Sequence, residues 1–232
     1  MTLTSYRSAM FFVLIAASQL VDAGTFYGAA GTARVVDASS GIPIADVIVE
    51  AVWEITNYRD PTGPSLAILR QIDTQTDANG QFTLPAWGPV TIDLHSNLRS
   101  VVKVLDHSQP HLYLYSLGYR TAVEQGPAND LRSFLNQLHL SDEDRREAWW
   151  DQRTFNLEHS SAGPEQRIDE LSLAMAALRN CRWVRTPQIA AAYIREAQKL
   201  TARNSSSDDP ATARLLDEDC PNAPRPLRTY LN

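Results

Sequence analysis

Three histidines and three tyrosines gather in the stretch 95–119, and these side chains can bind a metal ion or transfer a proton. They are His95, His107, His111, Tyr113, Tyr115 and Tyr119. His107 and His111 are four residues apart, which places two ligands side by side only on a helix, and Pro110 interrupts a helix there. We therefore expect loop histidines beside strand tyrosines, with no resident metal and no cofactor. The alternative is a metal site at His107, His111 and Tyr113.

The chain has two cysteines, Cys181 and Cys220. In an oxidising compartment an isolated pair favours a disulfide over two free thiols. The bridge would close a loop of about 40 residues and stabilise the fold by about 3–4 kcal/mol on the chain-entropy account. The alternatives are a buried free Cys181 or two thiols too far apart to bond. The surrounding sequence has no ligand at zinc-type spacing, so it does not predict a metal site at the pair.

Tryptophans can stack on sugar rings where they are exposed, and four of them, Trp53, Trp87, Trp149 and Trp150, are candidates. Trp53 falls on the apolar face of a predicted strand, so we expect it in the core. Trp87 lies in a loop between Pro85 and Gly88-Pro89, so it is the candidate ligand-binding residue. The sequence has no nucleophile elbow, zinc-protease motif or phosphate loop. We therefore predict no catalytic residues and a protein that is not an enzyme.

The first 23 residues have the pattern of an export signal. Arg7 gives a positive start, residues 10–21 are largely apolar, and Val21-Asp22-Ala23 predicts cleavage before Gly24. A helix over this apolar run would reach about 18 Å, short of the ~30 Å hydrocarbon core. We therefore expect a secreted or periplasmic protein with no stable membrane span after signal removal. Its net charge of −6 argues against nucleic acid as a partner.

Short apolar runs separated by turn residues predict a sandwich domain of about seven antiparallel strands over residues 27–122. Residues 47–55 alternate in character, which places Val49, Ala51 and Trp53 on one face. Ile48, Glu50 and Val52 share the opposite face, which we also expect to be partly covered. Asn79-Gly80 predicts a hairpin turn, with Phe82 and Leu84 pointing inward on the returning strand. Residues 101–105 are a further strand candidate.

Beyond residue 125 the apolar spacing becomes helical, and we predict a helical region over residues 126–220. Pro164 and Pro187 each precede an apolar stripe at the first helical position. A helix following Ser141 is expected to carry Trp149 and Trp150, and a stripe over 131–138 indicates another helix. A last short helix is expected from Pro210, and residues 221–232 form a proline-rich tail, expected to be extended. The fold class is therefore α+β.

Three motifs of the predicted sandwich resemble one known family. They are Gly31-Thr-Ala-Arg-Val-Val-Asp37, Ser40-Gly41-Ile-Pro43-Ile-Ala-Asp-Val47 and Thr76-Asp77-Ala-Asn79-Gly80-Gln-Phe82. Together they are similar to the carboxypeptidase regulatory-like family, over about residues 30–122. The resemblance implies a transthyretin-like (prealbumin-like) sandwich of seven strands that serves as a non-catalytic accessory or binding module.

Two enzyme families share the transthyretin-like sandwich, and this sequence departs from both. Intradiol dioxygenases hold iron with two tyrosines and two histidines, but their His-x-His pair is missing, because Leu112 and Tyr113 follow His111. A hydrolase of purine degradation ends in Tyr-Arg-Gly-Ser, whereas Tyr119-Arg120-Thr121 only begins in that way.

The sequence therefore predicts an exported, non-enzymatic binding or structural module of the cell envelope. Its partner would be an unidentified protein or envelope component. The alternatives are a metal-dependent enzyme that uses His107, His111 and Tyr113, or a carbohydrate-binding protein that uses Trp87.

Overall fold

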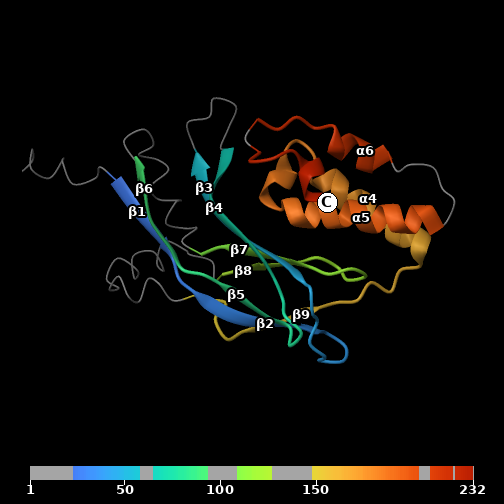
Figure 1. The fold of residues 1–232 in the computed structure, drawn as a ribbon, viewed down its shortest axis with the longest axis horizontal. Coiled ribbons are helices and arrows are strands. Elements are labelled where there is room, and N and C mark those ends of the chain that lie inside the picture. Colours follow the sequence, from blue (N-terminus) through green and yellow to red (C-terminus); the bar gives the residue numbers. More distant parts are fainter. Residues whose placement is uncertain are drawn as a thin grey trace, which may run out of the picture.

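The computed structural model describes residues 23–57, 65–93, 109–126, 148–203, 210–221 and 223–231. The fold is α+β: antiparallel sheets come first and a helical region follows (Figure 1). The strands are β1 (Ala23–Gly28), β2 (Gly31–Asp37), β3 (Ile48–Asn57), β4 (Ser65–Gln75), β5 (Gln81–Leu84), β6 (Trp87–Asp93), β7 (His111–Tyr115), β8 (Ala122–Gln125) and β9 (Thr154–Leu157). The helices are α4 (Pro164–Ala177), η3 (Arg182–Arg185), α5 (Pro187–Arg203), α6 (Pro210–Leu216) and η4 (Leu227–Leu231).

The strands form three sheets. A four-stranded sheet has the order β4-β3-β7-β8, a three-stranded sheet has the order β5-β2-β9, and β1 pairs with β6. All pairings are antiparallel except that of β2 with β9, which aligns Val35 with Phe155. The turn at Asn79-Gly80 forms, closed by the bond from the Asp77 N–H group to the Gln81 oxygen (2.8 Å), and Gly80 takes the left-handed backbone that it requires. The predicted hairpin was wrong, because the strands on either side of the turn belong to different sheets: β4 pairs with β3, and β5 pairs with β2.

The four-stranded sheet is covered on both faces, because β3 and β7 alternate in what they contact. Val49, Ala51 and Trp53 of β3 join a core with Phe82 and Leu84, all of them buried. The helix-facing side of the same sheet contributes Ile48 and Tyr115 to a second core, which contains the apolar stripes of α4 and α5. The result is three layers: the three-stranded sheet, the four-stranded sheet and the helices, which lie against the four-stranded sheet (Figure 1).

The two proline-initiated helices begin where the sequence predicts. Pro164 is at the first position of α4, and Leu171 and Met175 of its stripe are buried. Pro187 begins α5, and α6 runs from Pro210 to Leu216 as expected. None of the helices in the described part of the chain has the length and apolar content that a membrane span requires.

Several predicted boundaries differ from the structure. Strands extend beyond 27–122 at both ends, and β9 comes from the range 126–220 that we expected to be helical. Trp149 and Trp150 lie in a turn, not a helix, so that prediction was wrong. The tail 221–232 is not simply extended, because η4 forms in it and buries Leu227. Residues 1–22, 101–105 and 131–138, with their predicted signal, strand and helix, lie outside the described residues.

Candidate functional site

The two cysteines lie together in the helical layer. Cys181 follows α4, Cys220 follows α6, and a disulfide joins them with the two Cα atoms 5.5 Å apart. The expected bridge is therefore present, and it closes a loop with a sequence separation of 39 residues. It fixes the segment after α6 to the turn between α4 and η3.

Trp87, the candidate ligand-binding residue, is partly buried at the start of β6. Its ring meets that of Trp53 edge-on, with the ring centroids 5.2 Å apart. A Cβ atom added at Gly28 would come within 1.9 Å of the Trp87 Nε1 atom, so the ring lies directly over the β1 backbone. Trp150 also packs on Trp53, and Trp149 packs on Trp150. Trp87 is thus part of an aromatic cluster, and sugar binding by its exposed part stays a prediction.

Of the alternative metal ligands, His111 and Tyr113 lie on the same face of β7, two residues apart, with their ring centroids 6.5 Å apart. Burial raises the pKa of Tyr113, and the Glu54 carboxylate adds to this effect. His107 lies outside the described residues, so the three-residue site stays a prediction.

The most unusual side chain of the sheet is Glu50, which is fully buried in the middle of β3. Its two carboxylate oxygens accept hydrogen bonds from the backbone N–H groups of Gln188 (2.9 Å) and Ile189 (3.1 Å). These groups belong to the first turn of α5, where free N–H groups and the helix dipole favour a negative charge. Burial nevertheless raises the pKa of Glu50 well above its usual value, against the effect of these two bonds.

A second buried carboxylate of β3, Glu54, forms an ion pair with Arg185 of η3, with 2.9 Å between the Oε1 and Nε atoms. The Glu54 side chain is 3% exposed and that of Arg185 is 30% exposed. Glu50 and Glu54 therefore connect the sheet to two consecutive elements of the helical layer.

A third buried charge, Arg167 of α4, forms the centre of a network between helices and sheet. Its Nε atom donates to Glu196 of α5 (2.9 Å), and its Nη1 atom donates to Glu170 (3.0 Å). Its Nη2 atom donates to the main-chain oxygen of Tyr119 (2.8 Å). The hydroxyl of Tyr115, from β7, donates to the other oxygen of Glu196. The guanidinium thus joins two helices to the turn that follows β7.

The charges of this network reinforce one another. Burial alone would lower the pKa of Arg167, but its bonds to Glu196 and Glu170 raise it above the usual value. The bonds from Arg167 and Ser160 lower the pKa of Glu170. Burial, together with the bond to Glu196, raises the pKa of Tyr115. Arg167 therefore stays charged and Tyr115 stays neutral at any ordinary pH, so the network acts as a fixed clamp and not as a proton relay.

The turn that follows β2 is organised around the carboxylate of Asp37. The Oδ1 atom of Asp37 accepts hydrogen bonds from the backbone and hydroxyl groups of both Ser39 and Ser40. These bonds, that of the Ser39 hydroxyl first, hold the pKa of Asp37 well below its usual range. Tyr119 donates its hydroxyl to the Oδ2 atom (3.2 Å), and its ring packs edge-on against His159. The cluster ties the turn after β2 to the turn after β7.

Sequence reasoning placed Glu50 on a partly covered face but missed its role, and it missed Arg167 and Glu196 entirely. The signal for Glu50 is a carboxylate between Ile48 and Val52, in a run, residues 47–53, that is otherwise apolar on both faces. Arg167 and Glu196 are surrounded by charged residues in sequence, and helical spacing alone does not distinguish them from exposed residues.

Comparison with known proteins adds little to this geometry. No family model matches the chain, and no curated protein matches it. Among solved structures, the crystal structure of a group B streptococcus pilus 2b backbone protein matches with a TM-score of 0.27 and 12% identity. The match covers 58% of this chain and 42% of that one, so it spans less than half of the pilus protein. The likeness is distant.

Proposed function

We propose that this chain is an exported, non-enzymatic protein that acts by binding or structural support at the cell envelope. The observation that carries the proposal is the disulfide between Cys181 and Cys220, because such bridges persist in oxidising compartments and are rare in the cytosol. The export signal predicted for residues 1–23 points to the same compartment.

The buried charges support a structural role over a catalytic one. Glu50, Glu54 and Arg167 are each engaged by groups of a neighbouring layer. Catalytic acids and bases need contact with substrate, whereas these groups fix the helices to the sheet. The chain would therefore present a rigid body of sandwich and helices to its partner.

Export can be tested by expressing the full chain, and a version without residues 1–23, in a host with an export pathway. We expect the full chain to leave the cytoplasm, to lose its first 23 residues and to show no thiol that alkylates without reduction. The leaderless chain should stay inside and show two alkylatable thiols. A full chain that keeps its leader in the cytoplasm would contradict the proposal.

The binding role is tested with immobilised mature chain and two fractions of the source organism, the solubilised envelope and the cytosol. We expect an envelope component that is retained and that free mature chain displaces saturably. Retention that free chain cannot displace, or displacement only from the cytosolic fraction, would refute a role at the envelope.

A further inference from the structure

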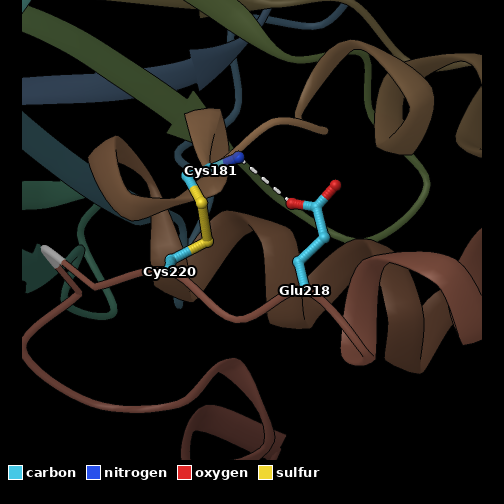
Figure 2. A group of neighbouring side chains, drawn as sticks. All are labelled: Cys181, Glu218 and Cys220. Carbon is cyan, nitrogen blue, oxygen red and sulfur yellow. Dashed lines mark hydrogen bonds between the residues drawn. A yellow bond between two sulfur atoms is a disulfide. The ribbon is translucent and has the colours of Figure 1, made fainter.

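The disulfide has an acidic neighbour. The side chains of Cys181, Cys220 and Glu218 meet at one point of the helical layer, and one ligand atom from each lies within 4.8 Å of the others (Figure 2). Glu218 belongs to the segment between α6 and Cys220. The main-chain oxygen of Asp219 lies 3.8 Å from the Cys181 Sγ atom, so a fourth polar atom faces the same point.

The position of the Glu218 carboxylate is fixed by the backbone. Its Oε1 atom accepts a hydrogen bond from the N–H group of Asn180 (2.9 Å), and its Oε2 atom accepts one from that of Cys181 (3.1 Å). Both donors have left-handed backbone, with φ values of 58° and 61°. This turn holds the acid beside the sulfur atoms, and each oxygen keeps a lone pair free for another ligand.

We propose that the reduced chain binds a thiophilic divalent cation, of which Zn²⁺ is the representative, through the thiolates of Cys181 and Cys220 and a carboxylate oxygen of Glu218. Thiolate sulfur and carboxylate oxygen are both established zinc donors. A tetrahedral ion with Zn–S bonds of about 2.3 Å needs its sulfur atoms about 3.8 Å apart. The two Cα atoms, 5.5 Å apart, allow this by rotation of the side chains. The fourth position falls to water or to the Asp219 carbonyl group.

The reaction that opens the site balances with an external dithiol as the reductant. One thiolate of the dithiol attacks the Cys181–Cys220 bond, and its second thiol resolves the mixed disulfide. Two electrons and two protons pass to the chain, and the reductant becomes a disulfide. The cation then displaces both protons from the new thiols. Metal binding and the disulfide are therefore mutually exclusive states of the same two sulfur atoms.

The local charge favours a cation once the bridge is open. The carboxylate of Glu218 makes it less favourable for each neighbouring thiol to become a thiolate, because like charges repel. A bound divalent ion offsets this repulsion. Cys220 is 8% exposed, and Cys181 and Glu218 are half-buried, so solvent screens this attraction only in part.

The test uses the purified full chain, reduced with a phosphine that is then removed without oxygen. Zn²⁺ binding is measured by competition with a coloured chelator, and Cd²⁺ binding by the thiolate-to-metal charge-transfer band in the ultraviolet. We expect one ion per reduced chain and none per oxidised chain. Cys220→Ser and Glu218→Gln each remove a direct ligand and should weaken binding by at least about 10-fold, because the loss of an outer-shell partner alone typically costs about 10- to 100-fold. The matched control Asp219→Asn removes a neighbouring charge but no ligand and should bind like the wild type.

Three results would overturn the proposal. The reduced chain could fail to bind Zn²⁺, Glu218→Gln could bind as tightly as Asp219→Asn, or the reduced chain unfolded in urea could bind as tightly as the folded one. Circular dichroism follows the fold during reduction. If reduction unfolds the helical layer, stoichiometric Zn²⁺ should restore its helix signal, and failure to restore it also refutes the site.

Discussion

Replacing Arg167 with methionine should be the most damaging single change to the contact between helices and sheet. Arg167 is 8% exposed, and its guanidinium donates to Glu196, Glu170 and the Tyr119 carbonyl oxygen. Methionine fills much of the same volume but donates nothing. Glu196, itself 5% exposed, would then keep a buried negative charge whose remaining side-chain partner is the Tyr115 hydroxyl.

The magnitude follows from the burial of the pair. Removing one partner of a buried ion pair typically costs about 3–5 kcal/mol, because the charge left behind is uncompensated. For a chain of this size each kcal/mol lowers the melting temperature by about 2–4 °C. Arg167→Met should therefore lower it by about 6–20 °C. The matched control is Arg120→Met, whose partner Glu158 is 3.7 Å away, with both side chains more than half exposed. It should cost at most about 1 kcal/mol.

The assay is urea unfolding of both variants and the wild type, followed by circular dichroism and tryptophan fluorescence. A second substitution provides the decisive comparison. Adding Glu196→Gln to Arg167→Met removes the orphaned charge but keeps an acceptor for Tyr115, so it should recover a large part of the lost stability. If Arg167→Met costs no more than Arg120→Met, or if Glu196→Gln worsens it further, the buried pair does not stabilise this contact as argued.

Three further changes test the other parts of the fold. Burial raises the pKa of Glu50, so wild-type stability should fall as pH rises from the unfolded-state value of 4.5 through the folded one. Burial also raises the pKa of Asp73, so in urea titrations from pH 4 to 8 the Glu50→Gln variant should show a smaller fall than the wild type. A stability advantage of the wild type that grows with pH would refute the sign. Cys220→Ser should lower the free energy of unfolding by about 3–4 kcal/mol, because it removes the bridge to Cys181. Reducing the wild-type chain should lower its free energy of unfolding by the same amount, which checks that the loss comes from the bridge. Gly28→Ala puts a Cβ atom 1.9 Å from the Trp87 Nε1 atom and should cost about 1–3 kcal/mol by overpacking, whereas unchanged tryptophan fluorescence and stability would show that the ring moves freely.

The sequence was sufficient to predict those elements whose boundaries or faces depend only on residues within the element. The alternation of residues 47–55 predicted which side chains of β3 enter the sandwich core, because a strand's faces follow directly from its period of two. Pro164 and Pro187 predicted the starts of two helices, because proline suits the first helical position and no later one.

Features that depend on distant residues could not be read in this way. β9 is four residues long, and only its parallel pairing with β2, more than a hundred residues earlier, makes it a strand. Trp149 and Trp150 follow a charge run that suits a helix. Their rings nevertheless pack on Trp53 and Phe155 in the sandwich core. In both cases tertiary contacts override local preference. The same holds for Arg167, whose burial depends on which helix packs over it.

The carboxylates of β3 show what the buried charges add beyond stability. Apolar side chains in place of Glu50 and Glu54 would cover the helices as well, since replacing buried ion pairs with hydrophobic groups is often neutral or better. They would not fix the position of the helices. Sliding α5 by one turn, about 5.4 Å, would take its first N–H groups away from Glu50 and move Arg185 away from Glu54. Glu54 would then be buried without its cation, and Glu50 would keep only the long bond from the Gln71 amide (3.5 Å), at a cost of several kcal/mol. We infer that only one docking position of the helices satisfies both acids, so the sandwich and the helices hold a single relative position.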